Sequence, residues 1–487
     1  MKNKIPIIKI VSIILILLSF LFLSSGLYYK EYYGDIDAEQ LFYTLNNADG
    51  TSPDVLKQIF AFIGIPFVIF STIALYIFLS SKNGFSYKAI ETKTTKIISL
   101  ILCMVLITPS CLFFIHSMGL DDYVWYQFSD SSFIEDNYKN PKDVKITFPQ
   151  NKKNLIFIFS ESMESSFTSI ENGGFLNTDA IPELTQLAKE NINFSNTDKL
   201  GGALPTYGST WTTAGIVSHT FGIPLKVGGG IYETGELPFL PGAYSMFEVL
   251  KDNGYNMLSI KGSKIKFGGL GKMLKDHGDI NYFDYNTAID TGKIPKDYLE
   301  FWGYEDIKLL DFAKEQLTTL SSKEEPFMLM METVDTHFPD GYICENCEST
   351  FSDQYTNVLR CQSELIFEFI QWCQTQDWYK DTTIVIVGDH LTMKANYFPK
   401  DSDYTRTIYN CFINSFAEAK NIKNRQFTEL DLFPTILASM GCKIDGDVLG
   451  IGTNLFSDKQ TLCEKYGYNF VNTELKKKSK FYSNELM

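Results

Sequence analysis

The hydrophobic residues of this chain are distributed unevenly, because nearly all of the long apolar runs lie within the first 120 residues. Three runs, at 5–27, 59–80 and 97–118, each contain about 20 residues or more. A helix of that length crosses about 30 Å of hydrocarbon at about 1.5 Å per residue. The first run is too long for the apolar part of a signal peptide, and two further runs follow it. The pattern therefore predicts three transmembrane helices within residues 1–120.

The charged residues that flank the apolar runs predict their orientation. The N-terminal MKNK and the segment 81–96 are rich in lysine, whereas the segment 28–58 carries six acidic residues and only two lysines. Short segments rich in lysine are typical of the cytoplasmic side of a membrane. We therefore expect the N-terminus inside, the first loop outside, and everything after the third run, about 350 residues, outside.

Beyond residue 150 the pattern changes to short apolar runs that alternate with amphipathic segments. Buried strands are predicted at 154–162, 256–260, 327–334 and 382–390, and helices at 181–191, 244–255, 305–320 and 357–376. Strands that are apolar almost throughout, separated by helices, are typical of a parallel sheet covered on both faces. We therefore predict an α/β fold, with ligands bound beyond the carboxyl ends of the strands.

The chain of 487 residues is too long for one small core, so several regions are expected. The patterns predict a three-span transmembrane region at 1–120, a polar and aromatic connector at 121–150, and a globular domain at 151–460. The remaining residues, 461–487, are predicted to form a C-terminal tail, in which the basic stretch LKKKSK is expected to be solvated.

Composition excludes one class of partner and indicates a compartment. The formal net charge of −15 argues against nucleic acid, whose binding needs a basic surface. Nine cysteines include seven beyond the third apolar run, so an oxidising compartment allows disulfides and leaves at least one thiol unpaired. For the CxxC of Cys344 and Cys347, we favour a local disulfide or two plain thiols over zinc, because no second pair or nearby histidine accompanies it.

Three predicted strands end in polar side chains of an unusual kind. Glu161 lies at the end of the first strand, Asp335 and His337 follow the third, and Asp389 and His390 end the fourth. If these strands are parallel neighbours, their carboxyl ends meet at one edge of the sheet. An aspartate after a strand is often only a helix cap, but carboxylates and an imidazole together suit a divalent cation such as Mn²⁺, Zn²⁺ or Mg²⁺. His337 could bind substrate or ligate the metal.

A nucleophile is expected in the stretch GGALPTYGSTWTTAGIVSHTFGIPL, which is rich in glycine and small hydroxyl residues and then becomes helical. A hydroxyl at a helix N-terminus gains from the helix dipole, and a nearby metal lowers its pKa. Ser209 and Thr210 are the candidates with the best placement. Both could instead be simple helix caps.

Five motifs in this order resemble the phosphoglycerol transferase and lipoteichoic acid synthase branch of the alkaline phosphatase–sulfatase superfamily. They are NLIFIFSESMESSF, GSTWTTAGIVSHTFGIPL, ETVDTHFPDGY, VGDHLTMK and DLFPTILASMG, and they lie within residues 150–460. The forms STWTTAG, TVDTHFPDG and GDHLTM are most similar to the phosphoglycerol transferases of osmoregulated periplasmic glucans. The resemblance implies a sulfatase-like sandwich with a mainly parallel central sheet, on the outer side of a bacterial inner membrane.

The resemblance also implies roles for individual residues. Glu161, Asp389 and His390 match the ligands of one divalent cation, which is usually Mn²⁺ in this branch, with Mg²⁺ or Zn²⁺ as alternatives. The nucleophile of the lipoteichoic acid synthases is a threonine, and a gapless count back from GIP places Ser209 at that position and Thr210 one step away. His337 and the stretch KGSKIKFGGLGK match residues that bind the donor head group.

This last stretch departs from the lipoteichoic acid synthases, which use a tryptophan and an arginine there. Phe267 takes the place of the tryptophan, and Lys264 or Lys266 could supply the cation without the bidentate fork of an arginine. The implied reaction moves sn-glycerol-1-phosphate from phosphatidylglycerol to a hydroxyl of a glycan or polymer through a covalent serine or threonine intermediate. The lipid product, diacylglycerol, leaves into the membrane, which explains the transmembrane tether.

The sequence also allows functions other than phosphoglycerol transfer. The Pro and Arg that follow the nucleophile of sulfatases do not follow Ser209, which argues against sulfate ester hydrolysis. A phosphoethanolamine transferase shares the tether and the superfamily, and a two-metal phosphatase would use Asp335 and His337 as additional ligands. A degenerate domain that only binds envelope glycans is the non-enzymatic alternative.

Overall fold

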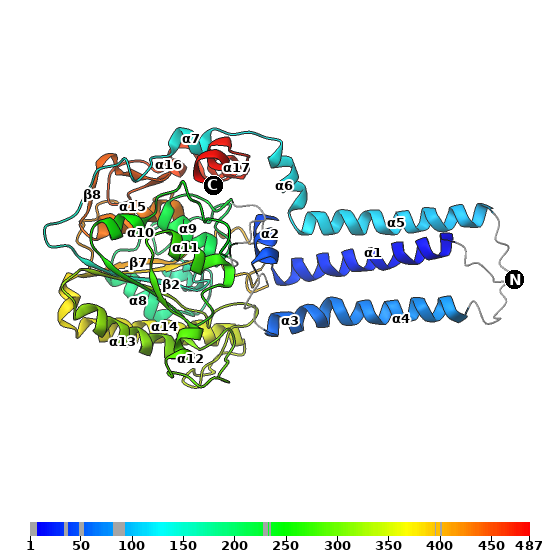
Figure 1. The fold of residues 1–487 in the computed structure, drawn as a ribbon, viewed down its shortest axis with the longest axis horizontal. Coiled ribbons are helices and arrows are strands. Elements are labelled where there is room, and N and C mark those ends of the chain that lie inside the picture. Colours follow the sequence, from blue (N-terminus) through cyan, green and yellow to red (C-terminus); the bar gives the residue numbers. More distant parts are fainter. Residues whose placement is uncertain are drawn as a thin grey trace. The chain divides into compact units, whose positions relative to one another are not determined.

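The computed structural model describes residues 7–33, 38–47, 53–80, 93–226, 232, 235–394, 396–399 and 402–487. The chain divides into two compact units. The first consists of Met1–Ala38, Ser52–Val124 and Lys394–Lys400, and the second of Glu39–Thr51, Trp125–Met393 and Asp401–Met487. Figure 1 shows the elements of both units.

The first unit is built from long apolar helices. They are α1 (Ile7–Tyr32), α3 (Pro53–Ile59), α4 (Ile65–Ser80) and α5 (Lys93–Ser117), and a π-helical segment, η1 (Phe60–Gly64), joins α3 to α4. Three segments, Ile10–Tyr32, Val55–Ile73 and Leu100–Ser117, are long and apolar enough to cross a membrane. Outward-facing residues such as Phe60, Leu102 and Val105 are more than half exposed, as lipid-facing side chains would be. The helices agree with the predicted transmembrane segments.

The second unit contains a six-stranded sheet with the order β4-β3-β5-β2-β6-β7. The strands are β2 (Asn154–Ser160), β3 (Asn256–Lys261), β4 (Asn281–Phe283), β5 (Phe327–Glu332), β6 (Thr382–Gly388) and β7 (Asn410–Ile413). All neighbours are parallel except β6 and β7, which are antiparallel. The predicted α/β fold with a mainly parallel sheet is therefore confirmed.

The central strands end level with one another. Phe159 of β2 lies opposite Glu332 of β5, and Ser160 lies opposite Gly388 of β6. The strands β5 and β6 are buried along their whole length, and β2 is buried after its first residue, as expected for strands covered on both faces. This register places the residues that follow β2, β5 and β6 at one edge of the sheet.

Helices cover both faces of this sheet, as Figure 1 shows, with α13 and α14 on one side and α9, α10 and α15 on the other. The α-helices between residues 151 and 460 are α8 (Pro182–Glu190), α9 (Thr212–Phe221), α10 (Met246–Asp252), α11 (Leu270–Asp276), α12 (Tyr285–Asp290), α13 (Asp306–Ser321), α14 (Gln354–Gln374) and α15 (Leu432–Ser439). Local signals fix their ends: Pro182 lies in the first turn of α8, and Ser245 and Glu248 form a capping box at α10. The four predicted helices correspond to α8, α10, α13 and α14.

The segments on either side of the predicted domain are also folded. They contain α2 (Ala38–Asn46), α6 (Leu120–Gln127), α7 (Phe133–Asn137), β1 (Ile146–Thr147), α16 (Leu462–Tyr466), α17 (Tyr468–Lys476) and η8 (Tyr482–Leu486). Three short strands lie near the end of the predicted domain: β8 (Lys443–Ile444), β9 (Val448–Leu449) and β10 (Gly452–Thr453). The C-terminal tail, 461–487, is thus folded, and its side chains Val471, Leu475 and Leu486 are buried in the second unit, whereas Lys478 and Lys480 of LKKKSK are exposed. The lysines of LKKKSK obscured this apolar periodicity.

Candidate active site

Three buried side chains meet at the carboxyl edge of the sheet. Glu161 follows β2, and Asp389 and His390 follow β6. Their ligand atoms all lie within 4.8 Å of one another. His390 Nε2 lies 3.3 Å from Asp389 Oδ2 and 3.6 Å from Glu161 Oε1. The structure thus brings together the three residues that the sequence predicted as metal ligands, and we refer to them as the triad.

Some polar atoms of the triad are held by hydrogen bonds, and others have no hydrogen-bond partner among the described residues. Asp389 Oδ1 accepts hydrogen bonds from the backbone N–H groups of Ser162 (2.7 Å) and His390 (2.9 Å). His390 Nδ1 is hydrogen-bonded to the carbonyl oxygen of Leu391 at 2.8 Å, so the Nε2 lone pair points into the triad. Asp389 Oδ2 and His390 Nε2 are buried and have no hydrogen-bond partner among the described residues. Open carboxylate and imidazole atoms of this kind fit a divalent cation.

The electrostatics of the triad agree with this fit. Burial and the neighbouring Glu161 raise the pKa of Asp389 to about 7. Burial lowers the pKa of His390, but the charges of Asp389 and Glu161 outweigh it, so that this pKa is raised overall. A divalent cation would stabilise the ionised carboxylates and the neutral imidazole together.

Two glycines allow the backbone to approach the triad closely. A Cβ atom on Gly388, the last residue of β6, would lie only 1.9 Å from the carbonyl oxygen of Met163. A Cβ atom on Gly215, in the first turn of α9, would lie 2.0 Å from the carbonyl oxygen of Asp389. These contacts explain the glycines in VGDH and TTAG, because a larger residue at Gly388 would collide with the backbone of Met163, and one at Gly215 would push α9 away from the end of β6.

Two hydroxyls contact the triad: Ser162 Oγ donates to Glu161 Oε1 at 2.6 Å, and Thr212 Oγ1 approaches the other oxygen of Glu161 from the start of α9. Trp211 is extended, and α9 begins at Thr212, whose Oγ1 lies 3.4 Å from Glu161 Oε2. Its position in the first turn also exposes a bound anion to the positive end of the helix dipole. Sequence reasoning missed Thr212 because it placed the start of the helix too early in the run STWTT.

Ser209 and Thr210, the predicted nucleophiles, make other contacts. Ser209 Oγ is fully buried and is hydrogen-bonded to Glu429 Oε1 at 2.8 Å and to the carbonyl oxygen of Thr206 at 2.7 Å. Thr210 Oγ1 donates to Gln40 Oε1 at 2.9 Å. These positions do not support either hydroxyl as the attacking group.

His337 lies beside the triad within an aromatic cluster. Its ring centroid lies 4.5 Å from that of Trp302, which in turn lies 5.1 Å from that of Phe267. Burial lowers the pKa of His337 to about 4, and the charges of His390 and Asp389 also act on it. His337 is therefore a neutral hydrogen-bonding group next to the triad. Trp302 was missed by sequence reasoning because it lies between motifs, far from the stretch that matched a tryptophan.

Lys264 and Lys266, the predicted cations of the head-group stretch, are less buried than a nearby lysine, Lys261. Lys266 is exposed and Lys264 is half-buried. Lys261, at the end of β3, is buried and forms an ion pair with Glu332 at the end of β5. Its charge also contributes to the lowered pKa of His337. Lys261 is thus a buried cation near the aromatic cluster, close enough to act on His337.

A second acidic group lies near the same edge and differs from the triad. Asp306 at the start of α13 accepts backbone hydrogen bonds from Val334 (2.8 Å) and Asp335 (2.9 Å). Asp335 Oδ2 accepts in return from the Asp306 N–H at 3.0 Å. We refer to Asp306 and Asp335 as the carboxyl pair. Within the described ranges, Asp335 and His337 do not join a group of metal ligands, in contrast to what a two-metal site would need.

Comparisons with known proteins agree with this fold. The Sulfatase family model matches residues 153–442, more than half of the chain. The chain is 31% identical over 343 residues to phosphoglycerol transferase I of Salmonella choleraesuis (strain SC-B67), covering 68% of this chain and 42% of the relative. It is 34% identical over 266 residues to phosphoglycerol transferase I of Salmonella typhi, covering 53% of this chain and 33% of the relative. The chain therefore spans less than half the length of these curated relatives.

Solved structures share the architecture. The lipoteichoic acid synthase LtaP from Listeria monocytogenes superposes with a TM-score of 0.51 at 19% identity, covering 67% of this chain and 81% of that chain. The integral membrane protein lipooligosaccharide phosphoethanolamine transferase A (EptA) from Neisseria meningitidis has a TM-score of 0.51 at 13% identity, covering 91% of this chain and 87% of that chain. At these identities the likeness concerns the fold alone. Together with the family model, it shows that the chain belongs to the sulfatase family.

Proposed function

We propose that this protein is a membrane-tethered phosphoglycerol transferase that moves sn-glycerol-1-phosphate from phosphatidylglycerol to a hydroxyl of an extracytoplasmic glycan or polymer. The observation that carries the proposal is the Thr212 hydroxyl, 3.4 Å from a carboxylate of a triad with open ligand atoms. Two curated relatives named phosphoglycerol transferase I, at 31% and 34% identity, support the head group.

In this proposal Glu161, Asp389 and His390 hold one divalent cation, with Mn²⁺ the first choice and Mg²⁺ or Zn²⁺ the alternatives. When bound, such an ion lowers the pKa of a nearby hydroxyl and neutralises phosphate charge. The residues of the chain prepare the site for it: the Leu391 carbonyl orients the His390 ring, and Ser162 holds Asp389 through its N–H. Ser162 Oγ also donates to Glu161 Oε1 at 2.6 Å, which fixes the third ligand.

Thr212 is the proposed nucleophile, in place of Ser209 or Thr210. Its Oγ1 attacks the phosphorus of phosphatidylglycerol, and the bond from phosphorus to the diacylglycerol oxygen breaks. Diacylglycerol takes up a proton and leaves, while glycerol-phosphate remains esterified to Thr212. An acceptor hydroxyl then attacks the same phosphorus, the bond from phosphorus to Thr212 Oγ1 breaks, and Thr212 takes up the proton that the acceptor loses. The kinetics should therefore be ping-pong.

The aromatic cluster is the proposed site for the glycerol head group. Trp302 and Phe267 offer flat apolar surface, and His337 offers a neutral hydrogen-bonding nitrogen beside the triad. Lys261 supplies positive charge at this place, while Lys264 and Lys266 remain predicted contacts on the rim. A lysine acts as a point charge, so it needs no fixed geometry with the phosphate.

The proposed location is the outer side of a bacterial inner membrane, with the chain crossing it three times. One contact within the second unit supports this topology. Tyr43 lies between the first two apolar helices in sequence, and its Oη donates to the carbonyl oxygen of Gly268 at 2.6 Å. The loop after α1 therefore folds with the catalytic residues, which requires both to lie on the same side of the membrane.

The test uses the full chain reconstituted into vesicles that contain phosphatidylglycerol labelled in its glycerol head group. We expect Mn²⁺-dependent release of diacylglycerol and transfer of the label to an added cell-envelope extract, where the labelled product identifies the acceptor. Vesicles of phosphatidylethanolamine serve as the matched control. Turnover of phosphatidylethanolamine without turnover of phosphatidylglycerol would make the protein a phosphoethanolamine transferase instead.

A further inference from the structure

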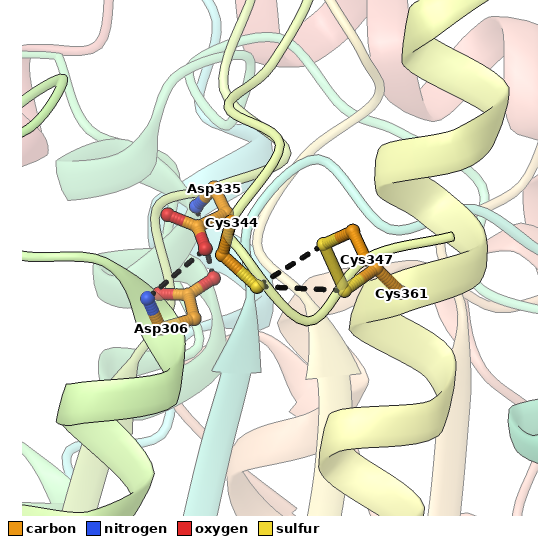
Figure 2. The surroundings of a disulfide bond; sticks show 5 residues. All are labelled: Asp306, Asp335, Cys344, Cys347 and Cys361. Atoms are coloured by element: carbon orange, nitrogen blue, oxygen red, sulfur yellow. Dashed lines mark hydrogen bonds between the residues drawn. A yellow bond between two sulfur atoms is a disulfide. The ribbon is translucent and has the colours of Figure 1, made fainter. Parts of the chain in front are cut away.

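Three cysteine sulfurs form a cluster on the loop that follows His337. Cys347 is disulfide-bonded to Cys361 of α14, 14 residues later, with a Cα–Cα distance of 5.2 Å. The Sγ atom of Cys344 lies 3.2 Å from that of Cys347 and 3.8 Å from that of Cys361, as Figure 2 shows. The expectation of a local bridge between Cys344 and Cys347, or of two plain thiols, is therefore wrong. Periodicity in the sequence could not show that Cys361 faces this loop.

We propose that Cys344, Cys347 and Cys361 form an intramolecular thiol–disulfide exchange site. The Cys344 thiolate attacks Cys347 Sγ, a Cys344–Cys347 bond forms, and the Cys347–Cys361 bond breaks. Cys361 leaves as a thiolate and takes up the proton that Cys344 released. The exchange is neutral in electrons, so it needs no external oxidant or reductant.

The geometry fits both partners of Cys347. The backbone N–H of Cys347 donates to the carbonyl oxygen of Cys344 at 3.1 Å, which closes a four-residue turn. The ends of such a turn lie within about 7 Å, which overlaps the Cα–Cα range of disulfides. Cys344 Sγ lies beside the existing bond, at similar distances from both sulfurs, and not on its axis. A rotation about the Cys344 side chain therefore precedes the in-line attack.

The surroundings hold Cys344 in its resting, protonated form. The Cys344 side chain is buried beside the carboxyl pair, as Figure 2 shows. Burial and the charges of Asp335 and Asp306 raise the pKa of the Cys344 thiol. Cys347 is partly exposed, whereas Cys344 and Cys361 are buried. The Cys347–Cys361 bond is therefore the resting connectivity, and exchange proceeds through a minor thiolate population.

The exchange would move a covalent tether near the aromatic cluster. In the resting form, the disulfide joins the loop to α14; after exchange, the bridge lies within the loop and α14 is released from it. The same loop carries Tyr342, whose ring stacks on Phe301 with centroids 6.1 Å apart. Phe301 in turn contacts the ring of His337, with centroids 6.4 Å apart. An effect on donor binding rests on the proposed function, but the exchange itself does not.

The direct test maps disulfides in the full chain, purified in detergent without reductant. The protein is held at pH 8.5, quenched with acid, alkylated and digested with trypsin. Arg360 precedes Cys361, so trypsin separates Cys361 from the peptide that holds Cys344 and Cys347. We expect two populations: one with linked peptides and alkylated Cys344, and one with an internal bridge and alkylated Cys361. Linked peptides alone, with Cys344 the only alkylated member at all times, would overturn the proposal.

Serine variants of single cysteines test the exchange by their disulfide maps, which can be read without measuring lipid turnover. In Cys344→Ser only the linked peptides should appear, and in Cys361→Ser only the internal bridge. Cys373→Ser, in the same helix, is the matched control and should show both wild-type populations. One equivalent of zinc that all three cysteines are needed to retain would also overturn the proposal, because the cluster would then be a metal site. With labelled phosphatidylglycerol, the Cys344→Ser and Cys361→Ser variants should differ severalfold in KM for the lipid.

Discussion

The triad and the carboxyl pair are both buried acidic groups at the carboxyl edge of the same sheet. The carboxyl pair leaves one oxygen, Asp335 Oδ1, without a hydrogen-bond partner among the described residues, whereas the triad leaves two ligand atoms from two different residues. In the carboxyl pair, three of the four oxygens accept backbone N–H groups of Asp306, Val334 and Asp335. In the triad, Asp389 Oδ2 and His390 Nε2 have no hydrogen-bond partner in the part of the chain that the structure describes. Burial raises the pKa of an aspartate in both places.

The difference shows that a raised pKa does not by itself identify a functional site. Desolvation raises the pKa of any buried carboxyl group, both one that hydrogen-bonds to two backbone segments and one that binds a ligand. What separates the two groups is the direction of the remaining lone pairs. In the carboxyl pair three oxygens bind backbone N–H groups that join the start of α13 to the residues after β5, and one oxygen is left over. In the triad, ligand atoms from three residues converge within 4.8 Å. The following predictions test this division.

The largest effect is expected when the triad loses a ligand. Asp389→Ala should remove the bound metal and lower the release of diacylglycerol by on the order of 10³-fold or more, because catalysis by the hydroxyl then lacks its activating cation. Metal content by mass spectrometry and turnover of phosphatidylglycerol measure the two effects. Asp335→Asn is the matched control and should keep its metal. Full turnover by the Asp389→Ala protein would contradict the assignment of the triad as the site of the catalytic metal.

The next effect separates hydroxyls that face the triad from those used inside the protein. Thr212→Ala should lower kcat on the order of 10³-fold, whereas Ser209→Ala should change it by less than about tenfold, because Ser209 is bonded to Glu429 and Thr206. Mass spectrometry of the trapped intermediate should find glycerol-phosphate on Thr212. An adduct on Ser209 or Thr210 would instead support the count made from the sequence.

A smaller effect is expected in the aromatic cluster. Trp302→Ala should raise KM for phosphatidylglycerol about tenfold, or about 1.4 kcal/mol, with a smaller change in kcat, because stacking on the head group is lost in the ground state and the transition state alike. Trp378→Ala offers a matched control, since Trp378 packs on Phe327 at the opposite end of the sheet. Initial rates over a range of lipid fractions separate the two parameters. Equal KM values for the two variants would remove Trp302 from the head-group site.

The smallest effect concerns stability and tests the carboxyl pair. Burial raises the pKa of Asp306 to about 7 and that of Asp335 well above its usual range. An unfolded aspartate titrates near pH 4, so between about pH 4 and pH 7 the folded chain binds more protons than the unfolded chain. Stability from this pair is therefore full below about pH 4 and is lost as the pH rises through about 7.

The variant Asp335→Asn keeps the shape of this side chain without its charge. As the pH rises from 5 to 8, the unfolding free energy of the variant should fall by about 1 kcal/mol less than that of the wild type, which corresponds to about 2 °C in Tm. Thermal unfolding in detergent measures this difference. Diacylglycerol release should stay within about threefold of the wild type, because Asp335 holds backbone and not metal. Identical pH profiles for the two proteins would show that Asp335 is ionised throughout this range.

Much of the fold could be predicted from local patterns. The apolar run that becomes β6 is seven residues long and ends at Gly388, and its neighbours β2 and β5 show the same pattern. Runs of this kind are specified by neighbouring residues, because a strand buried on both faces must be apolar throughout. The same reasoning predicted the transmembrane helices and placed Glu161, Asp389 and His390 at one edge, since parallel strands share the direction of their carboxyl ends.

The sequence by itself thus determined the parallel sheet, the apolar helices and the three residues of the triad. Only the tertiary structure decided that Thr212 faces Glu161, that Cys361 pairs with Cys347, that Trp302 lies against His337, and that residues 461–487 are folded. Periodicity records which side of an element is buried, but not which distant side chain it meets there. Each of these contacts depends on where a helix begins or how a loop returns to the sheet, and packing across the whole unit fixes both.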